Sequence, residues 1–384
     1  MREVVIVEAV RTPVGKRKGL LSSVRPDELA AKVLKELVNR AGISPGIVQD
    51  VILGCVSQVE EQGLNIARTA ALMADFPIHV PGTTLDRQCG SGQQAIHFAS
   101  QAILSGDMDI VIAGGVESMT RVPLGSSRQK SDWSETLTSK YEIIHQGLSA
   151  ERIADLWGFT RTQLDEFSIE SHNRALKAQE EGRFDKEIMP IEVTLEDGTS
   201  VVVNQDEGPR KGSTIEKLAA LKTVFKEDGK IHAGNASQMS DGAAAVLLMS
   251  RDKAEELGLK PRFRIVARSV VGSDPTLMLT GPIEATKQVL AKAGLTIDDI
   301  DTYEVNEAFA PVPMCWLEET KADPKKLNPN GGAIALGHPL GATGAKLMIS
   351  MMHELERTGG LYGLQAICEG GGMANGTIIE RISE

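Results

Sequence analysis

The chain has 384 residues, 41% of them hydrophobic, which predicts about two or three domains with substantial apolar cores. Its 52 acidic residues outnumber its 41 basic ones, and a net charge of −11 without a basic block argues against a nucleic-acid partner. The four cysteines form no CxxC pair, and there is no signal sequence and no apolar run near ~20 residues. We therefore expect a cytoplasmic protein with no metal site and no membrane span.

The first part of the chain alternates between apolar strands and amphipathic helices. Because continuous apolar strands alternate with helices, the pattern predicts a parallel sheet covered on both faces. Gly42 is expected to end the first helix, and Gly114 and Gly115 to end the last strand. The predicted elements are, in order, a strand at 4–7, a helix at 26–41, a strand at 51–53, a helix at 65–74 and a strand at 110–113.

Cys89 lies where an extended run, 80–85, meets a helical pattern of apolar residues. A cysteine at a helix start faces unpaired N–H groups and the positive end of the helix dipole, which favour the thiolate. Gly90 and Gly92 would let a carbonyl approach the backbone, whose N–H groups could receive an oxyanion. Cys89 is therefore a candidate nucleophile, and the alternative is a small buried apolar side chain.

The sequence becomes polar and irregular after about residue 120, which predicts an inserted lid. Within it we expect helices at 149–157 and 162–181 and a hairpin at 193–204. The strand and helix pattern then returns, with a strand at 243–249, a helix at 252–257 and a strand at 263–267.

An internal repeat relates the two ends of the chain. The helix and strand of residues 28–54 recur about 252 residues later, at 284–303, and each copy later reaches a glycine-rich strand end. Two similar α/β halves are implied, although chance similarity between amphipathic helices is an alternative explanation.

Three stretches in the second half of the chain contain residues that, like Cys89, could take part in catalysis. His338 lies between glycines just before a predicted helix, 345–355, and its ordinary pKa near ~6.5 suits a base. Cys368 follows the apolar strand 364–367, so its thiol would emerge at the carboxyl edge of a parallel strand. Asn306 belongs to the third stretch. Together they form a set suited to acyl transfer.

These motifs resemble those of the thiolases, and the resemblance runs from end to end of the chain. The matching stretches are 86–92 (the nucleophile motif), 306–309 (NEAF), 337–339 (GHP), 368–372 (the second cysteine motif), 234–237 and 241–244. The resemblance implies an acyltransferase of fatty-acid metabolism and β-oxidation. The implied fold is a layered α-β-α-β-α core of two similar βαβ-rich halves with an inserted lid or loop domain.

The resemblance also implies a role for each catalytic residue. Cys89 would accept the acyl group as a thioester while His338 removes its proton, and Cys368 would exchange the proton on the α-carbon of acetyl-CoA. The N–H groups of Cys89 and Gly370 would hold one oxyanion, and His338 with a water fixed by Asn306 would hold the enolate. Asn306 taken alone could equally be an amide that caps a turn.

By the same resemblance, coenzyme A is a substrate and product, and no cofactor is tightly bound. Arg210 would bind the phosphates of coenzyme A, and Phe225 would stack near its adenine. Ala236, Ser237 and Leu148 would complete the site. A homodimer or homotetramer is expected on the same ground. The domains would be residues 1–120 completed by about 239–261, an insertion at 121–238, and residues 262–384.

Other readings of the glycine motifs are weaker. Residues 90–95 satisfy the dinucleotide pattern G-x-G-x-x-A, but Asp107 and Asp109 precede the next strand, where a ribose-binding acid should follow it. Residues 332–337 are followed by His338 where a Walker A motif needs lysine. A non-catalytic acyl-CoA-binding relative would tend to lack one of Cys89, His338 or Cys368.

The acyl substrate is expected to be longer than four carbons. Gln146 stands where acetoacetyl-CoA-forming thiolases usually carry Met, Leu279 stands where a Gly is common, and the segment between Met119 and His145 is compact. Met278 is retained, which points toward the alternative, an acetyl-CoA acetyltransferase acting on acetoacetyl-CoA.

Overall fold

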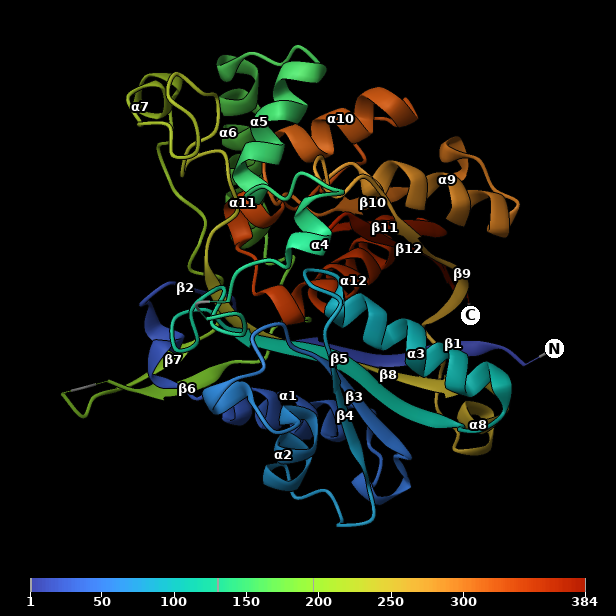
Figure 1. Ribbon diagram of the computed structural model, residues 1–384. Helices are drawn as coiled ribbons and strands as arrows, with labels where there is room; N and C mark the ends of the chain where they lie inside the picture. Colours follow the sequence, from blue (N-terminus) through green and yellow to red (C-terminus); the bar gives the residue numbers. More distant parts are fainter. Residues whose placement is uncertain (1, 130, 196, 384) are drawn as a thin grey trace.

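The computed structural model describes residues 2–129, 131–195 and 197–383, and ten strands within them form one sheet made of two half-sheets (Figure 1). The first half-sheet has the order β4 (Gly82–Leu85), β3 (Asp50–Gly54), β5 (Ile110–Ser118), β8 (Ser240–Ser250) and β1 (Val4–Arg11), with β2 (Gly15–Lys16) paired to β8. The second half-sheet has the order β9 (Phe263–Gly272), β12 (Met373–Arg381), β11 (Tyr362–Glu369) and β10 (Thr302–Val305). A short antiparallel contact between β1 and β9 joins the halves.

The sheet is mixed, so the prediction of a parallel sheet is wrong. Strand β3 is parallel to β4 and β5, and β10 is parallel to β11, but β8 and β12 are antiparallel to both of their neighbours. Strand β12 follows β11 through a tight turn at residues 370–372, and so short a connection can join only antiparallel strands. The apolar runs indicate that the strands are buried on both faces, but they do not indicate whether neighbouring strands are parallel or antiparallel.

Helices form three layers around the two half-sheets, which confirms the expected α-β-α-β-α core. Helices α3 (Ser91–Ser105) and α12 (Leu340–Thr358) pack on each other between the half-sheets. Helices α1 (Pro26–Ala41) and α2 (Ile66–Met73) cover the outer face of the first half, and α9 (Gly281–Ala293) and α10 (Pro311–Thr320) that of the second. The central layer is closed by apolar contacts in which Ala345 and Met348 of α12 pack with Val111 of β5.

The internal repeat is visible in the backbone. Helix α1 ends at Gly42 with φ 66°, and α9 ends at Gly294 with φ 69°, a left-handed conformation that glycine adopts without strain. Each glycine is followed by a 3-10 turn, at Pro45–Ile47 or Ile297–Asp299, and then by a strand, β3 or β10. The two halves therefore have similar architecture, with α3 and α12 in the central layer.

The glycines of β5 lie inside the strand, where the sequence pattern predicts its end. They serve close packing: a Cβ on Gly114 would lie 2.0 Å from the carbonyl oxygen of Ala244. A Cβ on Gly115 would lie 1.9 Å from the carbonyl oxygen of Gly341, in the first turn of α12. The first turn of α12 therefore rests directly on the backbone of β5.

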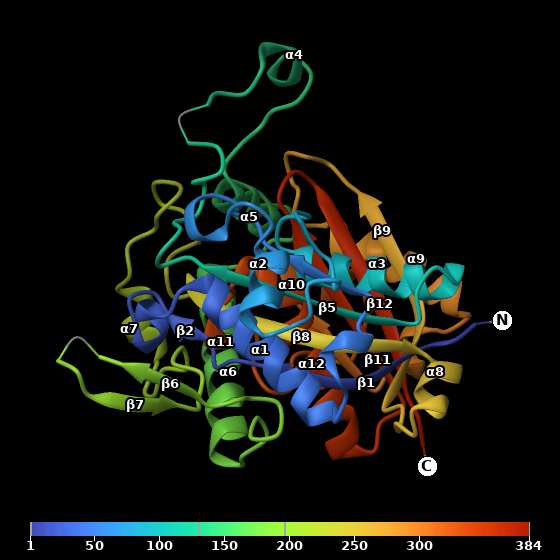
Figure 2. The same ribbon diagram turned by 90° about the horizontal axis from the view of Figure 1, so that it is seen from below.

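The segment between β5 and β8 forms small elements on both halves. Helices α5 (Gln146–Leu156) and α6 (Arg161–Glu180) lie beside the second half, while the hairpin of β6 (Ile191–Thr194) and β7 (Ser200–Val203) packs on the first. Helix α4 (Glu135–Thr138) lies on a loop that projects from the body (Figure 2). The remaining elements are α7 (Ile215–Ala219), α8 (Arg251–Glu256), α11 (Ala333–Leu336), and 3-10 turns at Leu20–Ser23 and Glu60–Gln62. Lys130 and Glu196, which fall in the predicted polar loop and hairpin, lie outside the described residues.

Gly115→Ala should lower the free energy of unfolding by about 1–3 kcal/mol or more, because the new methyl group would meet a backbone oxygen that cannot move freely. Gly272→Ala is the matched control: it lies on β9 with no atom within 4 Å of the added Cβ, so it should be neutral or stabilising by up to about 1 kcal/mol. Urea unfolding of both variants checks this. Equal stability of the two would contradict the close packing.

Candidate active site

Cys89 lies in a tight turn between β4 and α3. Gln88, just before it, has φ 49°, an uncommon conformation for a residue with a side chain. The Ser91 hydroxyl holds the turn: it accepts from the backbone N–H of Arg87 at 2.8 Å and donates to the carbonyl oxygen of Gln88 at 2.6 Å. Because α3 begins at Ser91, the thiol lies at a helix start, as predicted from the sequence.

Backbone N–H groups of Cys89 and of Gly370 point at the Cys89 sulfur and lower the pKa of its thiol. Burial and the nearby Glu369 carboxyl act more strongly in the other direction, and together they raise the pKa of Cys89 to about 12. The expectation of a thiolate favoured by the helix start is therefore wrong for the resting enzyme. Desolvation in this site outweighs the helix N-terminus, so Cys89 rests as a thiol.

His338 lies in the turn that leads into α12 and is held in one orientation. Its backbone N–H donates to the carbonyl of Gln238 and to the hydroxyl of Ser240. Its Nδ1 lies 2.6 Å from the hydroxyl oxygen of Thr343, and that hydroxyl donates its own hydrogen to the carbonyl of Pro339 at 2.8 Å. Since Thr343 can then only accept, Nδ1 carries the proton and Nε2 carries the lone pair.

Burial, with a smaller contribution from the charge of Lys346, lowers the pKa of His338 to about 3. The ordinary value expected from the sequence does not hold, because the ring is almost completely enclosed. The imidazole is neutral at physiological pH and can accept a proton at Nε2. The resting pair is therefore a thiol and a neutral imidazole.

Asn306 contacts His338 directly, with 3.4 Å between its Nδ2 and Nε2 of the ring. Its Oδ1 is buried and has no hydrogen-bond partner within the described part of the chain. The adjacent Glu307 fixes this segment, because its carboxylate accepts from Ser171, from Asn328 and from the backbone N–H of Ile334. Asn306 thus holds its amide beside the ring, with one oxygen left to bind a ligand or water.

Cys368 is buried near the end of β11, in an apolar cluster that includes Met278 and Phe309. Burial raises the pKa of its thiol well above the usual range, and the neighbouring Cys89 and Glu369 raise that pKa further. Both cysteines are free thiols. The structure thus brings Cys89, Cys368 and Gly370 together, and Asn306 together with His338.

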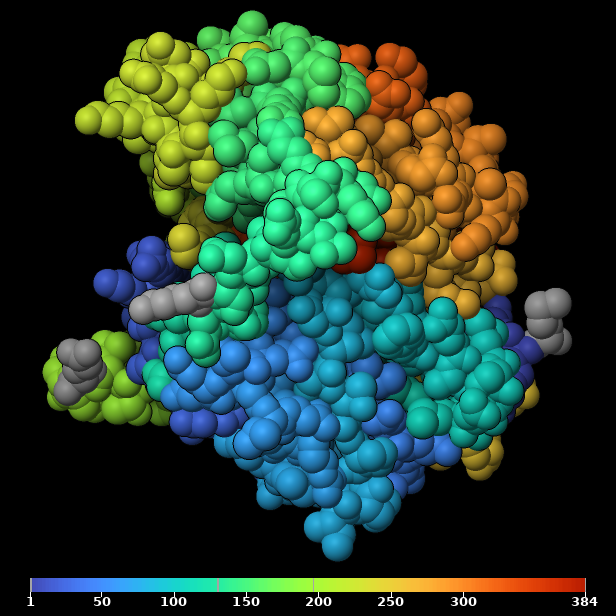
Figure 3. Space-filling model, in the orientation of Figure 1, coloured from blue at the N-terminus to red at the C-terminus, as the bar shows by residue number. Residues whose placement is uncertain are grey.

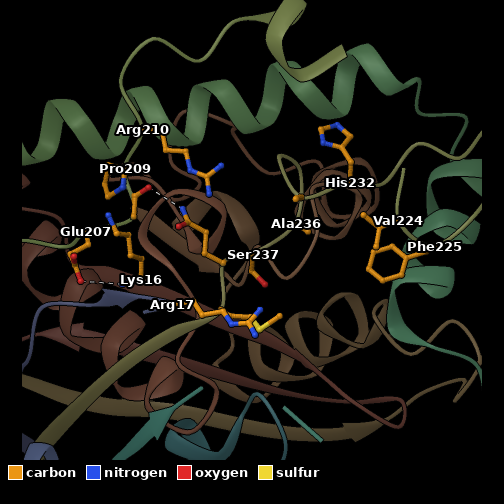
Figure 4. Close-up of a pocket in the computed structure, with 14 residues that line it drawn as sticks. Lys16, Arg17, Glu207, Pro209, Arg210, Val224, Phe225, His232, Ala236 and Ser237 are labelled. Atoms are coloured by element: carbon orange, nitrogen blue, oxygen red, sulfur yellow. Dashed lines mark hydrogen bonds between the residues drawn. The ribbon is translucent and has the colours of Figure 1, made fainter. Parts of the chain in front are cut away.

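A cavity of about 710 Å³ (Figure 4) is lined in part by Gln238, whose carbonyl accepts from the backbone N–H of His338. Four of the five residues expected at coenzyme A line it: Arg210, Phe225, Ala236 and Ser237. Leu148 does not, but its neighbour Gly147 packs against the ring of Phe225. The surface is hollowed between the yellow-green residues around α7 and the dark blue N-terminal residues (Figure 3).

The cavity wall continues into the NEAF segment. Ala236 pairs with Phe309, and the backbone N–H of Ser237 donates to the carbonyl of Ala308 at 2.9 Å. A ligand in the cavity would therefore lie against the chain that carries Asn306.

Sequence reasoning missed several residues of the site. Lys16 and Arg17 line the cavity, and Arg17 approaches it from the side opposite Arg210 (Figure 4). The run of Lys16, Arg17 and Lys18 after Gly15 was the available signal. Thr343, one turn beyond His338, orients the ring, and only its spacing from the GHP motif could have suggested this.

The glycine motif after Cys89 does not form a dinucleotide site. A Cβ on Gly92 would lie 2.7 Å from the carbonyl oxygen of Gly341, so the first turn of α12 occupies the space that a pyrophosphate would need. No cluster of three or more His, Cys, Asp and Glu side chains suited to a metal occurs in the described part of the chain. No helix within residues 2–129, 131–195 and 197–383 has the length and apolar character to cross a membrane.

Comparisons with known proteins agree with this geometry. Residues 4–252 match the family described as thiolase, N-terminal domain, and residues 259–381 match thiolase, C-terminal domain. A steroid 3-ketoacyl-CoA thiolase of Mycobacterium tuberculosis is 51% identical, covering 100% of this chain and 95% of its own length. A 3-ketoacyl-CoA thiolase of Bacillus subtilis is 43% identical over 99% of this chain and all of its own. The crystal structure of an acetyl-CoA acetyltransferase of Bacillus anthracis superposes with a TM-score of 0.92, at 43% identity over 100% of this chain and 99% of that one. The chain belongs to the thiolase family of acyltransferases.

Proposed function

We propose that the protein is a 3-ketoacyl-CoA thiolase, an acetyl-CoA C-acyltransferase in which Cys89 carries the acyl group. The observation that carries the proposal is the setting of Cys89: two backbone N–H groups point at its sulfur, and Cys368 lies beside it. His338, with an available Nε2, supplies the base. The matches to thiolases over the whole chain support the same chemistry.

In the first half of the proposed reaction, His338 takes the proton of Cys89 and the sulfur attacks the 3-keto carbon of the substrate. The bond between carbons 2 and 3 then breaks, and its electron pair forms the enolate of acetyl-CoA. Cys368 protonates that enolate, which leaves an acyl thioester on Cys89. The N–H groups of Cys89 and Gly370 hold the oxyanion of the tetrahedral intermediate, and Asn306 with His338 holds the enolate oxygen.

In the second half, the Cys368 thiolate takes the proton of the coenzyme A thiol, and the coenzyme A sulfur attacks the thioester and releases a shortened acyl-CoA. His338 then returns to Cys89 the proton that it took in the first half. The cavity lined by Arg210, Phe225, Ala236 and Ser237 would bind coenzyme A. Arg210, with Lys16 and Arg17, supplies positive charge for its phosphates, and Phe225 supplies an aromatic face. Leu148 would contribute from α5, next to Gly147, rather than from the cavity wall.

The acyl group is proposed to be longer than acetyl. Met278 and Leu279 are buried in the apolar cluster that contains Cys368, so they would border the acyl chain. The relative with 51% identity is named for a steroid 3-ketoacyl-CoA, which also favours a large acyl group. Cleavage of acetoacetyl-CoA is the second candidate, favoured by the retained Met278 and by relatives named acetyl-CoA acetyltransferase at 42–43% identity.

We further propose a homo-oligomer in the cytoplasm. Strand β4 is an edge strand, and the fully exposed Leu64 and the largely exposed Ile78 lie near it, a surface that a second copy would cover. The free thiols suit a reducing compartment. The proposed domains are residues 1–120 completed by about 239–261, the insertion 121–238, and residues 262–384; β8 supports the first, because it lies between β1 and β5.

Wild-type enzyme mixed with a 3-ketoacyl-CoA should gain one acyl adduct in intact-mass measurement, and Cys89→Ala should gain none. Cys368→Ala should still acquire the adduct from an acyl-CoA, since transfer of the acyl group to Cys89 does not require protonation of a carbon atom. Its thiolysis and condensation rates should fall by roughly two to four orders of magnitude, the usual loss on removing a general acid–base. An adduct in Cys89→Ala, or normal turnover in Cys368→Ala, would refute the assigned roles.

Thr343→Val should lower kcat by about tenfold to a hundredfold with little change in KM, because Nδ1–H of His338 loses its acceptor and the ring loses its fixed tautomer. Thr343→Ser is the matched control, since it keeps the hydroxyl and should retain most of the activity. Steady-state thiolysis kinetics of both variants decide the matter. Equal loss in the two variants would show that the hydroxyl is not what holds the ring and would contradict this role.

Values of kcat/KM for thiolysis, measured on 3-ketoacyl-CoA substrates of four to about twelve carbons, should be highest above four carbons. Activity on acetoacetyl-CoA should remain detectable, because one or two methylenes change binding in an apolar pocket by only about 1–3 kcal/mol. A maximum at four carbons with a steep fall beyond it would instead make the protein an acetyl-CoA acetyltransferase.

A further inference from the structure

Glu369 is a buried acid beside the nucleophile that the mechanism above does not use. It follows Cys368 on β11, and because side chains alternate along a strand, the two residues point to opposite faces of the sheet. Cys368 faces the apolar cluster with Met278. Glu369 faces the turn before α3 and has 0% of its surface exposed.

The Glu369 carboxyl rests against the backbone of Gly90, the residue after Cys89. A Cβ on Gly90 would lie 1.8 Å from Oε1 of Glu369 and 2.7 Å from its Cδ, so the carboxyl occupies the space that any side chain at position 90 would need. Gly90 has φ −88°, which every residue can adopt, so this contact, and not backbone conformation, is what favours glycine here. Glu369 therefore supports the turn that presents Cys89.

Neither carboxyl oxygen of Glu369 has a hydrogen-bond partner among the described residues. The charged and titratable groups near it are Asp86 and Arg87 on the chain before the turn, Cys89 in the turn, and Cys368 on its own strand. The guanidinium of Arg87 lies 3.6 Å from the sulfur of Met373, the residue paired with Glu369 across the strands.

An unpaired carboxylate in such a site is costly. Burial raises the pKa of Glu369 to about 8, with Arg87 opposing this and Asp86 adding to it. The carboxyl is thus mostly neutral near pH 7 and becomes charged above about pH 8.

We propose that Glu369 is a positioning residue for Cys89: in its neutral form it supports the turn at Gly90, and in its ionised form it opposes ionisation of the Cys89 thiol. The proposal rests on the role of Cys89 proposed above. Two negative charges so close repel, so the two groups titrate as a coupled pair. Removing the carboxylate charge while keeping its shape should therefore ease thiolate formation on the alkaline side and change little near neutral pH.

The test is the rate of alkylation of Cys89 by iodoacetamide, followed by peptide mass, from about pH 6 to about pH 10. Glu369→Gln should match the wild type near neutral pH and react up to about tenfold faster near pH 9–10, a displacement of the profile by about one pH unit. Glu354→Gln, a buried carboxyl near the far end of α12, is the matched control and should follow the wild-type profile. Superimposed profiles for wild type and Glu369→Gln would overturn the proposal.

A second measurement tests the contact itself and does not depend on the folding of Glu369→Gln. Gly90→Ala should lower the urea midpoint of unfolding clearly in the wild-type background and much less in the Glu369→Ala background, where the space is vacant. Equal effects in the two backgrounds would overturn the positioning role.

Acyl transfer to Cys89 is measured in a separate experiment. If Cys89 gains no adduct from an acyl-CoA but its alkylation profile still shifts in Glu369→Gln, the proposed function fails while this inference stands.

Discussion

The structure depends on a backbone contact between the start of α3 and the start of α12. A Cβ on Gly344 would lie 2.1 Å from the backbone nitrogen of Gln93, and the carbonyl oxygen of Gly341 lies against both Gly92 and Gly115. Side chains at these positions would force the two helices apart. Because Cys89 precedes one helix and His338 the other, this contact sets side by side the helix starts that follow the proposed nucleophile and base, which come from different halves.

Buried carboxylates hold this contact in place. Glu117, on β5, accepts from the backbone N–H groups of Val56, Ser57 and Gly341 and from the side chain of Gln62. A charge enclosed without partners would cost several kcal/mol, whereas these donors offset that cost and tie the loop after β3 to the turn that carries His338. Arg11 acts similarly on the segment between β5 and β8, pairing at 2.7 Å with both Glu187 and Asp206. The polar contacts thus fix the loops, while the apolar layers hold the sheets.

Local signals in the sequence predicted the elements that have local causes. Helix α1 begins at Pro26 and ends before Gly42, as expected, because proline and glycine define both ends. Helix α12 begins at Leu340 and not at 345, because Gly341 and Gly344 are unfavourable in an isolated helix and are present for contacts with distant parts of the chain. Strand direction, the cavity residues Lys16 and Arg17, and the orienting role of Thr343 also depend on long-range packing. The motifs could identify Cys89, His338 and Cys368, but not that His338 and Cys368 are buried and Cys89 is partly buried, which sets their ionisation.

In this site the Cys89 thiol and the His338 imidazole are both uncharged before substrate binds. With the pKa of Cys89 near 12 and that of His338 near 3, an ion pair between them is disfavoured until a substrate and the two N–H groups stabilise the developing negative charge. The rapid-quench rate of Cys89 acylation by a 3-ketoacyl-CoA tests this account most directly. At neutral pH the rate in His338→Asn should fall by roughly two to four orders of magnitude, and it should recover as rising pH ionises the thiol without a base. An acylation rate unchanged by His338→Asn would contradict the account.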